Sequence, residues 1–429
     1  MRIALLLMIA GVLAAPAMAA GPADLGFEVA DEQGMSVVAS VHLHNAGTAP
    51  IDGVEVRMFA PCNQVGQKVF SLEFVPKPGA VEGDRWTQQC ARWRVPRLVA
   101  GAHFFALWAA RGACSEVRFQ LDPLRRSGST IPLSIRSAYL WSDPPSEADA
   151  GRSYIDRALD LAGYVRATLS QERSGLPFYQ AIARPEAPRL LADQLTRLCH
   201  ANGIPCRTVS GYARASGSEF TIDTAGRTWN EVYFAQSGWV PMAVSDPLEL
   251  GKRHNDCMVV RTSGYDPGGS APAAGSAPAP VGANLVFAHG FWGEVRGGND
   301  SLRITHRGYV SQTRRFQQDS DLIALFAALR DVADAGKLAG NLPQAAAGGN
   351  LAIGLLEPYL YHPDLKVVEA AAMAFGSIRQ SRSLPVLVDA MGRSPQADKL
   401  LAAQAELLTG RTLGADPAAW REYVKQGEK

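Results

Sequence analysis

Cysteine and histidine are the side chains of this sequence that could act as a nucleophile and its base. Six cysteines and eight histidines are spread over the 429 residues. A catalytic cysteine must be a thiolate, which a helix N-terminus and a neighbouring imidazolium favour, and a third group must orient the histidine. We examine these requirements first for the segment 190–233, around which the rest of the chain is organised.

This segment predicts one helix followed by two strands. The helix is indicated by leucines at helical spacing, namely Leu190, Leu191, Leu195 and Leu198. Gly203 can adopt the left-handed conformation that follows a helix, and Pro205 prevents the helix from continuing, so we expect it to end near Asn202. Residues 207–212 and 228–234 are rich in β-branched and aromatic residues and are separated by a polar stretch, which predicts two strands.

In this order, the motifs resemble the core of the transglutaminase-like superfamily. The matching stretches are 198–207 (LCHANGIPCR), 209–212 (VSGY), 229–233 (WNEVY) and 238–241 (GWVP). The resemblance implies an α+β, papain-like core. It also implies a triad made of a cysteine at the start of the helix, a histidine two residues before the tryptophan, and the aspartate of an Asp-Pro pair.

The three triad positions carry other residues in this chain. The family cysteine precedes the glycine of Gly-Ile-Pro by fifteen residues, and this position is Pro188, a residue favoured in a first helical turn but without a thiol. Arg227 replaces the histidine and Ala243 the aspartate, and Asp246 is a candidate for a displaced carboxylate. The resemblance therefore implies a degenerate triad and an inactive enzyme.

Another thiol could still be the nucleophile. Cys199 falls in the last turn of the predicted helix, where the negative end of the helix dipole raises a thiol pKa. Cys206 begins a strand, and the sequence gives His200 and His254 no geometry toward either thiol. An active cysteine-dependent transglutaminase or peptidase that uses a thiol other than the family's remains the alternative hypothesis.

The N-terminus predicts export. Met1-Arg2, an apolar run over 3–12 and the small residues 17–19 have the three parts of a secretory signal peptide, so residues 1–19 are expected to be removed. No later run reaches the length of a membrane span. A net charge of +1 suggests neither nucleic acid nor anionic membrane as a partner. We therefore expect a periplasmic or secreted bacterial protein.

The same compartment bears on the cysteines. An even number of cysteines in an oxidising environment makes disulfides plausible, although their connectivity cannot be read from the sequence. Neither a Cys-x-x-Cys nor a His-x-x-x-His pair occurs, so we expect no metal site. No cofactor is expected.

The pattern along the chain predicts a multidomain protein. Short alternating runs and turn residues over 20–130 are typical of an all-β sandwich and loosely resemble the immunoglobulin-like domain that precedes transglutaminase-like domains. Residues 131–312 form the predicted central α+β domain, with a low-complexity insertion at 268–280 and its last strands near 291–305. Residues 313–429 read as helices that resemble HEAT repeats, too few to stand without support from the preceding domain.

These features predict an exported, catalytically inactive transglutaminase-like protein that binds a protein or peptide or serves as a scaffold. If the active-site cleft of the family persists, Arg227, Trp229 and Trp239 are its candidate binding residues, and an arginine there can bind a carboxylate. The main role expected for Trp229, Glu231, Tyr233 and Trp239 is, however, to stabilise the fold. The HEAT-like tail is a second candidate surface, for partners among envelope proteins.

Overall fold

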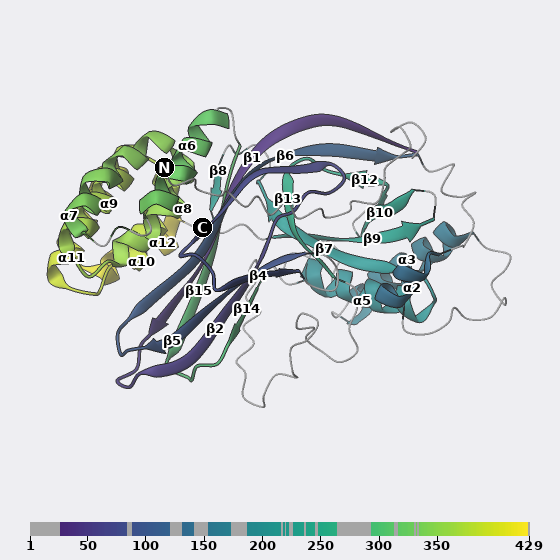
Figure 1. Ribbon diagram of the computed structural model, residues 1–429, viewed down its shortest axis with the longest axis horizontal. Helices are drawn as coiled ribbons and strands as arrows, with labels where there is room; N and C mark the ends of the chain where they lie inside the picture. The colour runs from purple at the N-terminus through teal and green to yellow at the C-terminus, as the bar shows by residue number, and fades with distance from the viewer. Residues whose placement is uncertain are drawn as a thin grey trace, which may run out of the picture.

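The fold has a β-rich N-terminal region, a central α/β region and C-terminal helices (Figure 1). A computed structural model describes residues 26–83, 88–120, 131–140, 153–172, 187–215, 218, 220–222, 226–235, 237–244, 248–263, 293–312, 316–329, 332 and 334–427. The predicted signal peptide at 1–19 and the insertion at 268–280 lie outside these residues.

The N-terminal region consists of two sheets packed face to face. Its strands are β1 (Phe27–Asn45), β2 (Ile51–Ala60), β3 (Gln67–Val75), β4 (Ala80–Gly83), β5 (Gln89–Leu98) and β6 (His103–Phe119). Four strands from later in the chain join them: β8 (Phe220–Ile222), β12 (Lys252–Arg253), β14 (Gly293–Arg296) and β15 (Leu302–Gln312). Sheet A has the order β12-β6-β1-β15-β8, with β3 also paired to β6, and sheet B has the order β14-β2-β5-β4. Their shared core includes Val37, Val41, Val56, Trp93 and Trp108. The predicted β-sandwich is therefore confirmed as an arrangement of two sheets.

Two strands from beyond the central region complete this sandwich. β14 (Gly293–Arg296) pairs with β2, and β15 (Leu302–Gln312) pairs with β1 over its whole length. We expected strands near 291–305 to be the last ones of the central domain. That expectation is wrong for these strands, because local alternation marks a strand but does not specify its partner.

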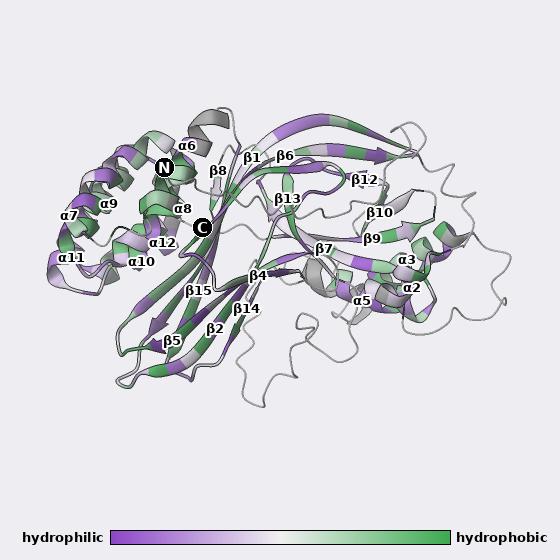
Figure 2. Ribbon diagram, in the orientation of Figure 1, coloured by the Kyte–Doolittle hydropathy of each residue, from purple (hydrophilic) through white to green (hydrophobic). Residues whose placement is uncertain are grey.

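Alternation along the strands gives sheet A two buried faces, and hydrophobic and hydrophilic residues alternate along β1 and β6 (Figure 2). On β1, Val37 and Val41 enter the sandwich core, whereas Val38 belongs to a second core on the opposite face. Leu107 of β6 and Tyr309 of β15 join Val38 on that second face. Sheet A therefore packs against sheet B on one face and against the C-terminal helices on the other.

The central region is a five-stranded sheet covered by helices. Sheet C has the order β11-β10-β9-β7-β13. Its strands are β7 (Cys206–Ala213), β9 (Arg227–Phe234), β10 (Gly238–Ala243), β11 (Glu249–Leu250) and β13 (Cys257–Ser263). Helices α3 (Tyr154–Glu172) and α5 (Ala187–Ala201) share a hydrophobic core with the sheet, and α2 (Leu133–Tyr139) precedes them. The predicted helix–strand–strand order is confirmed.

Two short strands of the central region join sheet A instead of sheet C. β8 (Phe220–Ile222), from the polar stretch between β7 and β9, pairs with β15. β12 (Lys252–Arg253) pairs with the far end of β6. The long strands β1 and β6 extend from the sandwich across the central region (Figure 1), so both regions share a continuous set of backbone hydrogen bonds.

Helix α5 ends as its sequence requires. Gly203 has a φ of +68°, the left-handed conformation that a side chain would strain. The amide of Ile204 donates to the carbonyl of Cys199 at 2.8 Å, which satisfies one of the last free carbonyls of the helix. The predicted helix end near Asn202 is confirmed.

The C-terminal region is helical throughout. It contains α6 (Phe316–Leu329), α7 (Ala335–Asn341), η2 (Leu342–Gly348), α8 (Asn350–Leu356), η3 (Glu357–Tyr361), α9 (Leu365–Ile378), η4 (Ser381–Ser383), α10 (Leu384–Asp389), α11 (Pro395–Thr409) and α12 (Pro417–Gly427). Asp364 and Ser394 cap α9 and α11 by accepting from the amides of Lys366 and Ala397.

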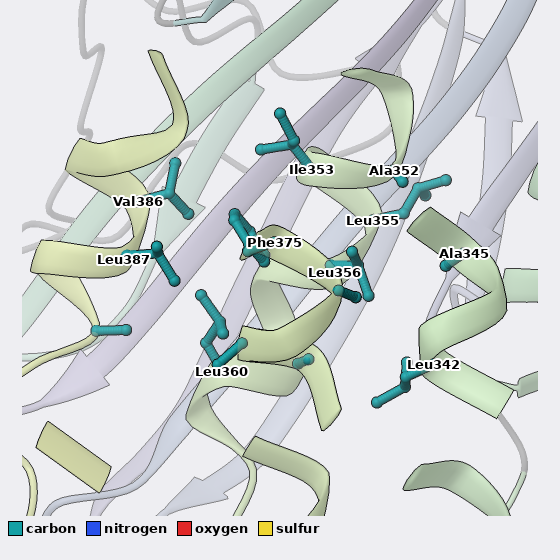
Figure 3. Packing of buried hydrophobic residues seen from close by; sticks show 14 of the residues in the cluster. Leu342, Ala345, Ala352, Ile353, Leu355, Leu356, Leu360, Phe375, Val386 and Leu387 are labelled. Atoms are coloured by element: carbon teal, nitrogen blue, oxygen red, sulfur yellow. The ribbon is translucent and has the colours of Figure 1, made fainter. Parts of the chain in front are cut away.

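These helices have no core separate from sheet A. Phe375 of α9 lies among Ile353 and Leu356 of α8 and Val386 and Leu387 of α10 (Figure 3). The same cluster continues into Val38, Leu107, Ala109, Phe220 and Tyr309 of the sheet. The helices therefore pack on the preceding β-region, as expected for an array too short to bury its own faces. No helix in the described part of the chain is long and apolar enough to cross a membrane.

Candidate functional site

The three triad positions converge at one end of sheet C. Pro188 is the second residue of α5, Arg227 the first of β9 and Ala243 the last of β10. Strand β10 runs antiparallel to β9, with Met242 opposite Asn230, so its end lies beside the start of β9. The Asn230 side chain donates to the carbonyl of Ala192 at 2.8 Å, and near the other end of α5 His200 contacts Cys206, which lies opposite Val232, so the helix begins toward the start of β9.

This convergence is the placement that a helix-borne nucleophile and two strand-borne partners would need. None of the three residues that occupy the positions can supply a nucleophilic thiol, a proton-accepting imidazole or a carboxylate. Asp246, the candidate displaced carboxylate, lies outside the described residues.

Arg227 is held by an ion pair at this end of the sheet. Its Nη1 lies 2.6 Å from Oδ1 of Asp256, and the two side chains are 37% and 33% exposed. The pair is therefore accessible to a ligand from solvent. Asp256 was not singled out by the sequence, because a pairing between residues 29 positions apart leaves no local pattern.

Trp229 lies near Arg227 but is a core residue. Its side chain belongs to a small buried cluster with Val209, Cys257 and Val259, against which Ala243 packs. Only 8% of Trp229 is exposed. The structure thus brings Trp229 to the site that the sequence indicated, in a position that stabilises the sheet and offers little surface to a ligand.

Trp239 is not brought together with Arg227. It pairs with Tyr233, which lies six residues beyond Arg227 on β9, or about 20 Å at roughly 3.3 Å per residue. Its ring contacts the rings of Tyr139 and Tyr233 and lies under the guanidinium of Arg207, 4.3 Å from its centroid. Trp239 therefore belongs to a different part of sheet C.

Two other motif residues form a strong contact beside Trp239. The Nε and Nη2 atoms of Arg207 both donate to one carboxylate oxygen of Glu231, at 2.8 and 2.6 Å. The side chains are 15% and 5% exposed. Arg207 on β7 and Glu231 on β9 lie directly opposite each other in the register, so this ion pair ties the two central strands together.

All six cysteines are reduced thiols in this structure, in contrast to the disulfides that an oxidising compartment makes plausible. Five of them are buried, and only Cys62 has intermediate exposure. A hydrogen bond with Cys206 and burial raise the pKa of Cys199, and burial raises the pKa of Cys257. Burial also raises the pKa of Cys114 to about 12. Protonated, buried thiols are poor nucleophiles.

The histidine next to Cys199 makes a different contact. The Nε2 atom of His200 lies 2.6 Å from the backbone carbonyl oxygen of Cys206, to which its N–H donates, and His200 is buried. His254 contacts Glu249 at 3.2 Å. Within the described residues no group of three or more histidine, cysteine or acidic side chains could hold a metal ion.

Burial predicts how the thiols react. In the folded chain, iodoacetamide at neutral pH should modify about one cysteine per molecule, namely Cys62, because only a thiol that reaches solvent can react. All six should react in denaturant. Mass spectrometry of tryptic peptides measures this directly, with Cys62→Ser as the control that abolishes native labelling. Rapid native labelling of Cys199, Cys206 or Cys257 would show that a buried thiol is accessible after all.

Comparison with known proteins gives a family match for part of the central region. Residues 187–244, from the start of α5 to the end of β10, match the model of the transglutaminase-like superfamily. A solved structure titled "Putative Cysteine Protease from Cytophaga hutchinsonii" is similar with a TM-score of 0.44 and 11% identity, covering 67% of this chain and 93% of that one. No curated protein matches the sequence.

Proposed function

We propose that this chain is an exported protein whose transglutaminase-like core is catalytically inactive and binds a peptide or protein. The observation that supports this most strongly is the convergence of Pro188, Arg227 and Ala243 at one end of sheet C. The scaffold keeps the arrangement of a cysteine active site, while the three side chains that would do the chemistry are replaced.

The buried thiols weigh against the alternative of an active enzyme. A substitute nucleophile needs solvent access and a base within hydrogen-bond reach. Cys199 and Cys206 are both 0% exposed, and the N–H of His200 already donates a hydrogen bond to the backbone carbonyl of Cys206. Cys257 is near the old site but is only 1% exposed. Opening any of these positions would require part of the sheet or of α5 to unfold.

Arg227 is the residue on which binding would depend. Its side chain is 37% exposed at this end of the sheet, and its planar guanidinium can donate to a second carboxylate besides Asp256. The ligand class that fits is therefore a peptide with a free carboxylate, either a side chain or the C-terminus.

Fluorescence anisotropy with a labelled peptide in two forms tests this proposal. The free-acid form should bind more tightly than the C-terminal amide, and Arg227→Gln should weaken binding of the free acid by about tenfold, as expected for one charge-assisted contact. Arg94→Gln, whose side chain on sheet B is 72% exposed, is the matched control. Prior alkylation with iodoacetamide should leave binding unchanged. Equal binding of acid and amide, or loss of binding on alkylation, would contradict the proposal.

A further inference from the structure

A large cavity lies between sheet A and the C-terminal helices, away from sheet C. Its volume is about 1000 Å³. One wall is formed by β1, β6 and β15, and the other by η3 and the segments around α9, α10, α11 and α12. None of its lining residues belongs to the central sheet, so the cavity is distinct from the site where the triad positions converge.

Three histidines form a contiguous patch on the sheet wall. His42 and His44 of β1 lie opposite Phe105 and His103 of β6 in the register. The Nε2 of His42 is 2.8 Å from Nδ1 of His103, and the rings of His44 and His103 stack with centroids 4.3 Å apart. The ring of Tyr361 closes the patch from the helical side, 4.5 Å from that of His42.

Four arginines bring positive charge to the same cavity: Arg303, Arg307, Arg393 and Arg421. Two carboxylates, Glu357 and Asp389, also line it, and Arg307 forms ion pairs with both of them. Arg303 is exposed and makes no ion pair with any residue that the structure describes. The wall therefore keeps a net positive charge, and Arg393 and Arg421, like Arg303, form no ion pair with either carboxylate.

Two of these arginines are held in place by backbone contacts. The Nε of Arg393 donates to the carbonyl of Ala390 at 2.9 Å, and its guanidinium lies over the ring of Tyr361. The Nη2 of Arg421 donates to the carbonyl of Met391 at 3.3 Å. Neutral carbonyl partners orient a guanidinium without cancelling its charge, which is how preorganised anion sites are built.

The polar wall contrasts with the rest of the same sheet face. Nearer the middle of the strands this face carries Val38, Leu107, Ala109 and Tyr309, which pack against the helices. Apolar residues alone would suffice to dock the helices, and polar groups are costly to bury unless they find partners. Histidine and arginine replace these apolar residues at the end of the sheet that lines the cavity.

The histidines are uncharged at neutral pH. Burial, followed by the neighbouring charges of His103, His44, Arg307 and Arg393, lowers the pKa of His42 to about 2. Burial and the same kind of repulsion lower the pKa of His103 to about 4. The hydrogen bond between His42 and His103 uses one nitrogen of each neutral ring, so one of the two rings keeps a free N–H donor and the other a free acceptor nitrogen.

We propose that this cavity binds a small anionic ligand with two or more carboxylate or phosphate groups. Arg303 and Arg421 would bind the charged groups from opposite walls, Arg393 would add a third cation, and the histidines would supply neutral hydrogen bonds. Because guanidinium groups bind carboxylates and phosphates with the same fork geometry, both are members of one ligand class here. Such a ligand would also link the helices to sheet A.

Isothermal titration of the full-length chain with citrate and with pyrophosphate, at constant ionic strength, tests the proposal. We expect saturable binding of at least one probe with a stoichiometry near one. Arg303→Gln and Arg421→Gln should each weaken it by about tenfold, because each removes a charge-assisted contact. The preferred probe identifies the source as a carboxylate or a phosphate ligand. Both arginines are exposed, so neither substitution should disturb folding.

Arg411→Gln is the matched control, since Arg411 is an exposed arginine of the same helical region that does not line the cavity. Its affinity should stay within about twofold of the original. Absence of saturable binding with both probes would overturn the proposal. So would an equal loss of affinity in all three variants, because it would reflect general attraction to positive charge.

Discussion

Replacement of Arg307 by methionine should lower the free energy of unfolding by about 3–5 kcal/mol. Arg307 is 5% exposed and lies 2.5 Å from a carboxylate oxygen of Glu357, whose side chain is 3% exposed. The other Glu357 oxygen accepts from the hydroxyl of Tyr309 at 2.8 Å. Without the guanidinium, the Glu357 carboxylate would remain buried with only neutral partners, which is costly. Urea unfolding measures the change.

Two further variants separate this cause from a general loss of packing. Glu357→Gln combined with Arg307→Met removes both charges, so the double variant should be more stable than the sum of the two single changes predicts. Arg303→Met, on the same strand but exposed, should change stability by less than about 0.5 kcal/mol. If Arg307→Met costs less than about 1 kcal/mol, the ion pair does not hold the helices to the sheet.

Glu231→Leu should destabilise the central region by about 3 kcal/mol, for the same physical reason on a different sheet. The substitution leaves Arg207, 15% exposed, without its carboxylate between β7 and β9. The contact of Arg207 with the Trp239 ring would remain, but a cation–π contact cannot replace two charge-assisted hydrogen bonds. Hydrogen exchange of the β7 and β9 amides, combined with chemical unfolding, locates and measures the effect.

Arg227→Gln is the informative comparison for Glu231→Leu. It breaks the ion pair between Arg227 of β9 and Asp256. The two side chains are about one-third exposed, so solvent already screens their attraction. We expect a cost below about 1 kcal/mol. A similar cost for both substitutions would mean that burial does not set the strength of these pairs, contrary to what we expect.

Local sequence signals predicted most of the secondary structure. Leucine spacing, Gly203 and Pro205 place the end of α5, because backbone conformation at a helix end depends on a few adjacent residues. Their β-branched and aromatic residues likewise predicted β7 and β9. Alternation predicted the sandwich, since one face of each strand must enter a core.

The pairing of distant strands could not be predicted in the same way. β15 contacts β1 although more than 250 residues separate them along the chain. The polar stretch after β7 contributes β8 to the edge of sheet A, and only three residues mark it. Such contacts depend on the complementarity of whole surfaces, about which a local pattern carries no information.

The candidate site was likewise predicted only in part from the sequence. The positions that the resemblance assigns to the triad, Pro188, Arg227 and Ala243, could be counted from the sequence, because a helix and its following strands leave little freedom in register. The structure adds that they converge. Asp256 could not be found, and neither could the cavity at His42 and Arg303, whose walls come from opposite ends of the chain.

The central claim is that the transglutaminase-like core performs no cysteine chemistry. The most direct test measures release of ammonia from glutamine peptides, incorporation of a fluorescent amine into casein and cleavage of a peptide mixture by the purified full-length chain, with and without iodoacetamide. We predict no turnover above the background of a variant in which all six cysteines are replaced by serine. Turnover that iodoacetamide abolishes and that is lost in Cys199→Ser, Cys206→Ser or Cys257→Ser would contradict the claim.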